Sequence, residues 1–238
     1  MSETIQIGAN DITTYYHARV VADSIEISGT PVTTAYVQGR NRTNFIFQTA
    51  QYGMKTIKFR VAFCESTRAL CEQYKTELLL ACTATANANV KMLKMPDGYY
   101  YRSLLKKIGK EEWLGSEDNG GILLFFDLEF EGIQQSNTLQ NVLDGRTSFT
   151  AVGTFPRMDA RLTVQVTANA SSYTLFGATF GSVTAGDILV FDGIDKRILK
   201  NGSPTVVTGY FEFPYVKAGT NQFTGNDPIK VEYYPCYL

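Results

Sequence analysis

The sequence predicts a mainly β protein that is built from two domains and carries one long helix. Apolar and polar residues alternate along residues 57–63 and 122–131, which is the period of a half-buried strand. Apolar residues recur at spacings of three and four along residues 66–81, which indicates an amphipathic helix. Residues 146–238 contain short apolar runs separated by glycine-containing turns, a pattern typical of a β-sandwich.

Two strands of the first domain each have one buried face. The strand over residues 55–63 places its isoleucine, valine and phenylalanines on one face, and Lys58 and Arg60 on the other. The strand over residues 122–131 has a second face that begins apolar and becomes acidic toward its end. The acidic residues of this face are Asp127, Glu129 and Glu131.

The helix is predicted over Ser66–Ala81, with Tyr74 and Leu78 on its apolar stripe. A helix with one such stripe is suited to pack on a sheet. Residues 90–101 predict a strand, a Pro-Asp-Gly turn and an aromatic strand. Three consecutive tyrosines end that segment, so one of its faces must present a tyrosine outward. Asn119-Gly120 predicts a hairpin turn.

A polar stretch from Gln134 to Arg146 lacks periodicity and predicts a domain boundary near Asp144-Gly145. We therefore expect a first domain of residues 1–145 and a second domain of residues 146–238. Short strands are predicted in the second domain at residues 162–166, 173–176, 188–191, 206–213 and 229–234.

Composition and charge exclude several classes of protein. Of the 238 residues 44% are hydrophobic, so a disordered chain is excluded. The formal net charge of −1 argues against a protein that neutralises many phosphates, so nucleic-acid binding is not expected. The N-terminus lacks a basic signal-peptide region, and the apolar runs are too short to span a bilayer. We expect a soluble protein, made in a cytoplasm, that has no membrane partner.

Side chains that carry catalysis are scarce. The four cysteines form no Cys-x-x-Cys pair, and His17 is the single histidine. A zinc site, a Cys–His pair and a serine triad are therefore not expected, and the thiols are predicted to be reduced and buried. No glycine-rich phosphate loop occurs. The sequence predicts no enzyme, no metal site and no cofactor. The cysteines are Cys64, Cys71, Cys82 and Cys236.

The acidic strand face is the one candidate site. Three carboxylates on one face could form a metal site or a glycosidase pair, and the spacing of about 7 Å between residues on the same face of a strand would suit an inverting pair. An exposed polar face is the simpler interpretation of Asp127, Glu129 and Glu131. The segment Asp192–Asp195 lacks the alternating oxygen ligands of a calcium loop, so we expect a turn there.

Two parts of the chain resemble the distal tail proteins of long-tailed, non-contractile bacteriophages. In the first half the resemblance lies in the strand and helix over Lys55–Ala81 and in Met95–Arg102. In the second half it lies in Gly186–Asp192, Lys200–Gly202, Phe211–Phe223 and Ile229–Leu238.

The resemblance implies a tail-tube-like first domain with one packed helix and a galectin-like second β-sandwich. It implies a structural virion protein, not an enzyme, that forms a hexameric ring between the tail tube and the tail tip or baseplate. The implied partners are other copies of the chain, the tail-tube protein and tail-tip or receptor-binding proteins. The implied location is the tail tip of the virion, after assembly in the host cytoplasm. Asp23–Asn44 would be an arm that wraps a neighbouring subunit, or alternatively an ordinary hairpin.

In such a ring, Asp127, Glu129 and Glu131 are candidate channel-lining residues, because an acidic wall would not hold DNA phosphates. The alternative is that these carboxylates pair with Lys58 and Arg60 on the neighbouring strand. Such exposed pairs contribute about 0.2–1 kcal/mol each.

Two other functions stay open. A tail-tube subunit would stack in many rings and would not need residues 146–238. A carbohydrate-binding β-sandwich module would follow from the galectin-like domain. Galectin-type sugar sites commonly use a histidine, an arginine pair and a tryptophan. Residues 146–238 contain neither histidine nor tryptophan, since Trp113 lies in the first half, which argues against a site of that type.

Overall fold

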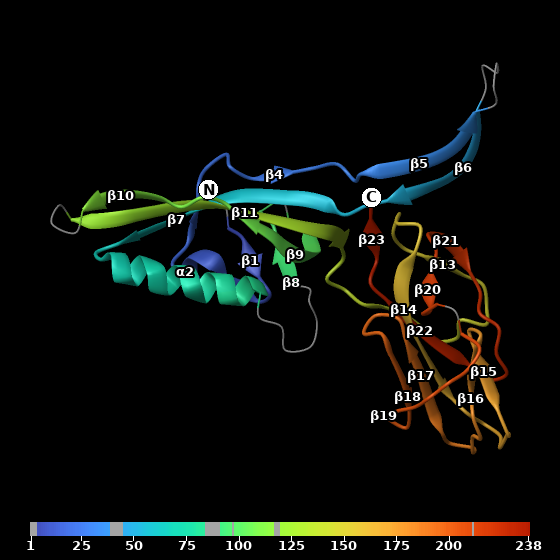
Figure 1. Cartoon of the computed structure of the whole chain (residues 1–238). Helices are drawn as coiled ribbons and strands as arrows, with labels where there is room; N and C mark the ends of the chain where they lie inside the picture. Colours follow the sequence, from blue (N-terminus) through green and yellow to red (C-terminus); the bar gives the residue numbers. More distant parts are fainter. Residues whose placement is uncertain (1–3, 39–44, 84–90, 97, 117–119, 211) are drawn as a thin grey trace. The chain divides into compact units, whose positions relative to one another are not determined.

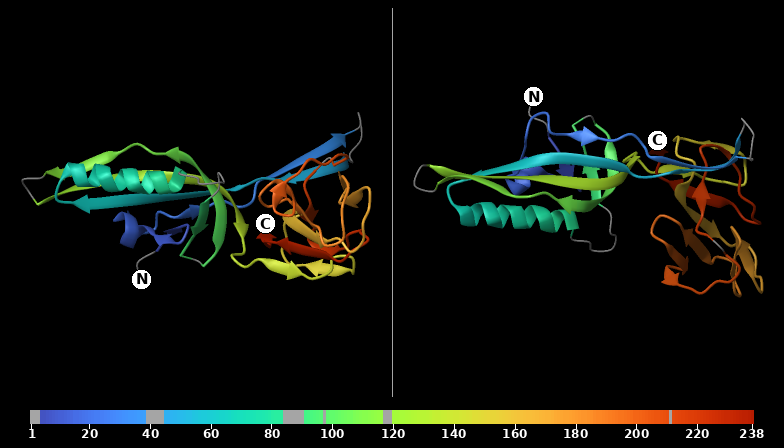
Figure 2. Two further views of the ribbon diagram at one scale, coloured as in Figure 1. Left: turned by 90° about the horizontal axis from the view of Figure 1, so that it is seen from below. Right: turned by 45° about the horizontal axis from the view of Figure 1, so that its top comes forward.

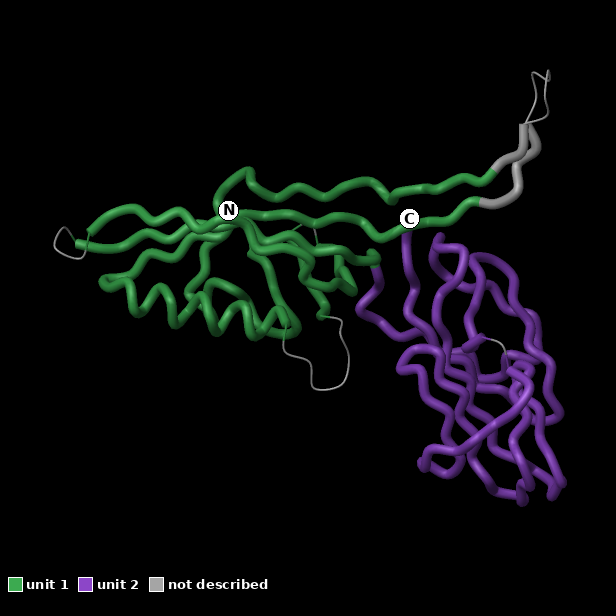
Figure 3. The backbone as a smooth tube through the Cα atoms, viewed as in Figure 1, with its two compact units in different colours: residues 1–134, 238 green, residues 135–237 purple. Residues whose placement is uncertain are grey.

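A computed structural model of the chain describes residues 4–38, 45–83, 91–96, 98–116, 120–210 and 212–238. The side chains of residues 36–38 and 45–49 are outside this description. The chain divides into two compact units, residues 1–134 with 238, and residues 135–237 (Figure 3). The mainly β class with a packed helix is confirmed.

The division between the units differs in position from the predicted boundary near Gly145. The polar stretch after Gln134 contains a short strand, β12 (Gln140–Val142), which pairs with β22 (Ile229–Tyr233) of the second unit. The backbone of Gly145 also donates a hydrogen bond to the carbonyl oxygen of Ile229, at 2.7 Å. A polar segment can thus belong to a domain through backbone pairing, which hydrophobic periodicity does not detect.

The first unit is built on one large sheet, in which the strands lie in the order β2-β1-β8-β9-β11-β7-β3. Two further strands, β10 and β4, pair with β11 and β7. The strands are β1 (Gln6–Ile7), β2 (Asn10–Asp11), β3 (Arg19–Val20), β4 (Glu26–Ile27), β7 (Lys55–Glu65), β8 (Lys91–Lys94), β9 (Tyr100–Ile108), β10 (Glu112–Ser116) and β11 (Gly121–Gln135). The hairpin predicted at Asn119-Gly120 is the β10–β11 pair, although Asn119 itself lies outside the described residues.

The core of the first unit lies between this sheet and helix α2 (Arg68–Thr83). Strands β7 and β11 are antiparallel, and their inward phenylalanines stack with centroids 5.7 Å apart for Phe59–Phe130 and 6.0 Å apart for Phe63–Phe126. Figures 1 and 2 show α2 along one face of these strands. The predicted alternation and the predicted helix are both present, and the helix begins and ends slightly later than expected.

The prediction of buried thiols holds for two of the four cysteines, is wrong for Cys64, and is met only in part by Cys236, which is half-buried. Cys71 and Cys82 are buried between α2 and the sheet, where burial raises the pKa of the Cys82 thiol to about 12. Cys64 is exposed, because it follows the buried Phe63 on β7 and so points to the opposite face. The tyrosine prediction holds, since Tyr101 on β9 is buried and Tyr100 on the opposite face is half-buried, while Tyr99 just before the strand is 53% exposed.

A short helix near the N-terminus was not predicted. Helix α1 spans Ile12–Tyr16, and the Asp11 carboxylate caps it by accepting hydrogen bonds from the amides of Thr13 and Thr14. A helix this short has too few turns for a 3.6-residue pattern. The imidazole of His17 stacks on the Tyr74 ring with centroids 4.0 Å apart, so the single histidine contributes to packing.

The second unit is a β structure with its own hydrophobic core. Its largest sheet has the order β12-β22-β14-β17-β18-β19, with β20 paired to β14, and two small hairpins are formed by β13–β21 and β15–β16. The further strands are β13 (Phe149–Ala151), β14 (Met158–Gln165), β15 (Tyr173–Leu175), β16 (Ala178–Phe180), β17 (Ile188–Asp192), β18 (Arg197–Lys200), β19 (Ser203–Pro204), β20 (Tyr215–Val216), β21 (Gly219–Asn221) and β23 (Cys236–Tyr237).

The strand predicted at residues 206–213 is absent from the described part of that segment. Only a single bridge, from Thr208 to Thr179, connects it to a neighbour. Val206 is 89% exposed, and Gly209 has a φ of +80°, which a strand does not accommodate. Val206, Val207 and Tyr210 are therefore β-forming residues that do not pair into a strand ladder.

Within the described residues, no helix combines the length and the apolar character needed to cross a membrane.

Candidate functional site

A long hairpin of the first unit pairs with no other described strand and has an exposed base. Strands β5 (Val32–Gln38) and β6 (Phe45–Tyr52) are antiparallel and form a two-stranded sheet of their own. In Figure 1 the hairpin extends beyond the end of the sheet that contains β7 and β11. At its base, the Gly53 amide donates a hydrogen bond to the Pro31 carbonyl oxygen, at 2.8 Å.

The exposed residues of the hairpin base include apolar side chains and no charged ones. Residues 31–35 and 51–54 are all exposed, and they include Val32, Tyr52 and Met54. Neither β5 nor β6 contains a charged residue, and β-branched and aromatic residues are frequent in both. Isolated two-stranded hairpins are marginally stable in water, and natural proteins normally protect exposed strand edges with charges. The hairpin base is therefore an exposed, uncharged strand pair that includes apolar side chains.

The acidic residues predicted on β11 lie as expected on the half-exposed face opposite the core. Asp127 is opposite Arg60 in the ladder, and its carboxylate lies 3.9 Å from both the Lys58 and the Arg60 cationic groups. The Glu131 carboxylate lies 3.1 Å from the Lys106 ammonium group. Glu129 is opposite Lys58 and has no ion pair within the described residues. Asp127 therefore makes the contacts with Lys58 and Arg60 that the cross-strand alternative names, whereas Glu131 pairs with Lys106 of β9 instead.

The same face carries further charges of both signs. The Arg60 guanidinium also pairs with the Glu112 carboxylate of β10, and its carbon lies 5.6 Å from the centroid of the Phe125 ring. On β4, Glu26 is opposite Lys58. The face therefore carries several weak, exposed ion pairs, and among the three carboxylates of β11 only Glu129 has no cation in direct contact within the described residues.

The segment Asp192–Asp195 is a turn, as predicted. The Asp192 carboxylate accepts hydrogen bonds from the amides of Ile194 and Asp195, at 3.0 and 3.1 Å. Its other oxygen accepts from Arg161 Nε at 2.9 Å. Backbone amides and a guanidinium thus occupy the oxygens that a cation would need.

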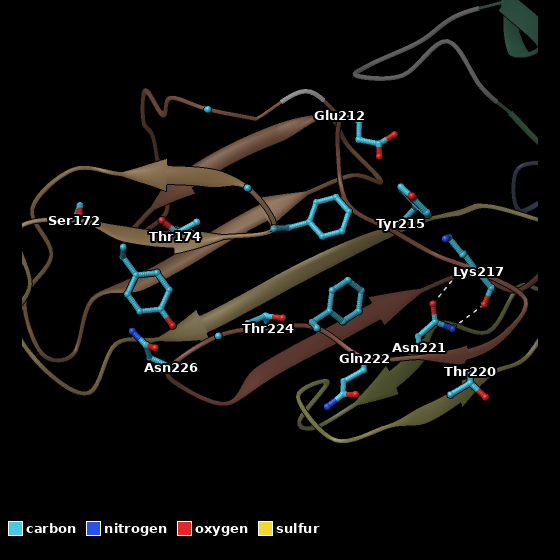
Figure 4. A pocket seen from close by; sticks show the side chains of 16 residues that line it. Ser172, Thr174, Glu212, Tyr215, Lys217, Thr220, Asn221, Gln222, Thr224 and Asn226 are labelled. Atoms are coloured by element: carbon cyan, nitrogen blue, oxygen red, sulfur yellow. Dashed lines mark hydrogen bonds between the residues drawn. The ribbon is translucent and has the colours of Figure 1, made fainter.

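Sequence reasoning missed a cavity of about 890 Å³ in the second unit. It is lined by residues of the β15–β16 hairpin and of the chain from Glu212 to Asn226 (Figure 4). No motif marks these residues, because they come from two segments that the fold brings together.

No protein-family model matches the sequence, and no curated protein matches it. Solved structures do match the fold. The SPP1 Dit protein, described as a paradigm of the hub adsorption apparatus in phages that infect Gram-positive bacteria, aligns with 100% of both chains at a TM-score of 0.64 and 10% identity. The chain shares the fold of SPP1 Dit.

Two structures of the phage P2 baseplate in its activated conformation also match. With calcium the TM-score is 0.52 at 12% identity over 99% of this chain and 98% of the other. With strontium it is 0.50 at 11% identity over 98% of each chain. The likeness to SPP1 Dit and to the P2 baseplate chains thus includes both units and not one domain alone.

Proposed function

We propose that the chain is a structural subunit of a phage tail hub, and that six copies close into a ring between the tail tube and the tail tip or baseplate. In this ring, hairpin β5–β6 of one copy lies against the first unit of the next copy. Support for the hub role comes from the full-length likeness of fold to SPP1 Dit, whose own description names a hub apparatus.

The observation that carries the ring is the hairpin itself. Its two strands are uncharged, pair with each other alone among the described strands, and expose Val32 and Tyr52. A closed ring of identical copies would cover every hairpin in the same way and leave no open edge. Addition of strands to a neighbour's sheet is a common way to hold such segments.

The second unit supports a hub over the alternative of a tail-tube subunit. A tube subunit needs a ring-forming domain and no appended β domain, whereas the likeness to SPP1 Dit covers residues 135–237 as well as the first unit. Electron microscopy of the purified chain separates the two, because a hub gives discrete rings and a tube subunit gives stacks of many rings.

The ring is tested with one lysine substitution and light scattering. The unaltered chain is expected to have the mass of about six chains of 26.4 kDa each. Val32→Lys places an unpaired charge on the surface that the neighbour would cover, so assembly should weaken at least about tenfold, or by about 1.4 kcal/mol.

A matched control is Val206→Lys, which puts the same charge on the most exposed valine of the second unit. This variant should keep the mass of the unaltered chain. A monomeric unaltered chain, or equal masses for the Val32→Lys and Val206→Lys variants, contradicts the hairpin-mediated ring.

A further inference from the structure

The cavity of the second unit has a composition that identifies a class of ligand. Its 16 described lining residues are glycines, aromatic residues, hydroxyl and amide residues, one glutamate and one lysine. None of them is leucine, isoleucine, valine or methionine. A site for a lipid or an apolar peptide would be lined largely by aliphatic side chains, so this lining favours a ligand that is itself polar.

The lining contains one anionic and one cationic side chain. Glu212 lies at the rim, where its carboxylate is already paired with Arg157 at 2.8 Å. Lys217 lies at the opposite side of the cavity from Ser172 (Figure 4). A site for phosphate or nucleic acid would collect several cations at one place. The lining therefore favours a neutral ligand.

An aromatic wall gives the cavity an apolar surface of fixed geometry. The Phe176 ring is at 5.8 Å from the Tyr215 ring and 5.9 Å from the Phe223 ring, measured between centroids. The Arg157 guanidinium stacks over Tyr215 at 4.4 Å and holds that ring in place. Such rings pack well against flat C–H faces and leave their polar neighbours free to form hydrogen bonds.

Phe176 lines the cavity from an unusual backbone position, and its ring also packs on the edge of the core, 6.4 Å from the Phe191 ring between centroids. Phe176 and Gly177 form the two-residue loop of the β15–β16 hairpin, and both have positive φ, at 48° and 78°. Loops of this kind favour Asn-Gly, and a bulky residue with positive φ is unusual. Strained residues of this sort occur preferentially at ligand sites.

Polar groups along the facing edge are available to a ligand. The side chains of Ser172, Thr224 and Asn226 form no hydrogen bond to any described residue. Gln222 is fixed by donating from Nε2 to the Arg146 carbonyl oxygen at 2.8 Å, which leaves its Oε1 atom as an acceptor. In Figure 4, Gln222, Thr224 and Asn226 follow one edge of the cavity.

The loop beyond this edge is held rigidly. The Asn221 side chain accepts a hydrogen bond from the Lys217 amide at 2.8 Å and donates to the Lys217 and Gly219 carbonyl oxygens at 2.7 and 2.8 Å. These bonds are drawn for Lys217 in Figure 4. A site that is already ordered loses little conformational entropy when a ligand binds.

We propose that this cavity binds a neutral oligosaccharide. The apolar C–H face of a pyranose ring would pack on Phe176 and Tyr215, and its hydroxyl groups would bond to Gln222, Thr224 and Asn226. The site differs from the galectin type considered from the sequence, since it uses neither histidine nor tryptophan. It is contained in the second unit, so it does not depend on whether the chain forms a ring.

The test uses the full chain and four neutral probes: maltohexaose, cellohexaose, laminarihexaose and chitohexaose. Binding is measured by saturation-transfer NMR and titration calorimetry, with a hyaluronan hexasaccharide as the acidic comparison. At least one neutral probe is expected to bind with a Kd of about 1 mM or lower, and the acidic probe should bind more weakly.

Two variants locate the site. Phe176→Asn removes the ring but suits a loop with positive φ, and Asn226→Ala removes a side chain that no described residue uses. Each should weaken the saccharide about tenfold without changing the circular dichroism spectrum. Asn141→Ala, at an exposed asparagine of β12 outside the cavity, should leave the Kd unchanged.

Three results overturn the proposal. One is the absence of binding by all four neutral probes at about 10 mM. Another is saccharide binding that neither Phe176→Asn nor Asn226→Ala weakens. The third is tighter binding of the acidic probe at the cavity. If Phe176→Asn does not fold, Asn226→Ala alone decides, because its side chain takes no part in the fold.

Discussion

At the scale of single residues, the second unit depends on carboxylates that act as acceptors for the backbone. Asp144 accepts hydrogen bonds from the Arg146 amide at 3.0 Å, from Arg146 Nε at 3.1 Å and from the Ile229 amide at 3.2 Å. These bonds, chiefly those of Arg146, hold the pKa of Asp144 well below its ordinary value of 3.8. The carboxylate thus joins the chain after β12 to the start of β22.

The depressed pKa of Asp144 predicts how stability changes with pH. A carboxyl group with a lower pKa in the folded state stabilises that state above its unfolded pKa, near 3.8, and loses this contribution as pH falls further. Asp144→Asn should therefore lower the urea midpoint of the second unit at pH 7. The difference from the unaltered chain should shrink progressively as the pH is lowered below about 4.

Asp159→Asn is the matched control, because Asp159 is an exposed aspartate that pairs with Lys196 at the surface. It should change the urea midpoint little at either pH. A gap between Asp144→Asn and the unaltered chain that stays constant from pH 7 to pH 2 contradicts the assigned role of the carboxylate.

At this scale, the sequence predicts which residues are buried wherever apolar and polar residues alternate along a strand. The buried positions of β7 and β11 follow from Phe59 and Phe126 and their period of two, and the exposed Cys64 follows from the same rule applied one residue further. The cavity could not be predicted in this way. Phe176 and Asn226 are distant in the sequence, and each belongs to a segment that is ordinary by itself.

At the scale of elements, the acidic face of β11 separates two hypotheses from the sequence. In one the carboxylates line a channel, and in the other they pair with cations on neighbouring strands. Asp127 and Glu131 have cationic neighbours on β7 and β9, whereas Glu129 has none in direct contact among the described residues. If the face lines a channel, the negative charge of Glu129 would act on passing DNA most strongly, because no neighbouring cation in contact offsets it.

Glu129→Lys is the resulting test. The variant breaks no ion pair within the described residues but sets a second cation opposite Lys58, so it should fold and assemble with slightly lower stability than the unaltered chain. If Glu129 lines the channel, the variant rings should bind a short DNA duplex, and the binding should weaken as the salt concentration rises. The measurement is fluorescence anisotropy of labelled DNA at two ionic strengths.

Asp127→Lys is the comparison, because it sets a third cation beside Lys58 and Arg60. It should destabilise the first unit by about 1 kcal/mol, measured by urea unfolding. Folded Glu129→Lys rings that bind no DNA at low salt contradict the channel position of this face.

The elements also show where prediction from periodicity ends. The predicted arm over Asp23–Asn44 is described up to residue 38, where β4 pairs with β7 and β5 pairs with β6 of the same chain. Its wrapping of a neighbour stays a prediction, since pairing between copies leaves no mark in one chain's sequence. The strand expected at residues 206–213 shows the converse case, in which β-forming residues find no partner strand.

At the scale of the whole molecule, the two units have separate cores. One hydrophobic cluster is confined to residues before Gln134, and the other begins after it. Two cores of this kind indicate two domains that fold independently. The ring hypothesis then requires only the first unit, which contains the hairpin, and the saccharide hypothesis requires only the second.

Truncation at the observed division separates these requirements. A chain that ends at Gln134 keeps the whole first core and the β5–β6 hairpin, so it should fold and show by light scattering about six times its own mass. A chain of residues 135–238 should be a folded monomer, because it keeps β12 paired with β22 and all residues of the cavity. Cutting at Gly145 instead removes β12 from its partner and should lower the thermal stability of the second unit. A folded but monomeric 1–134 chain would show that the second unit, and not the hairpin, holds the copies together.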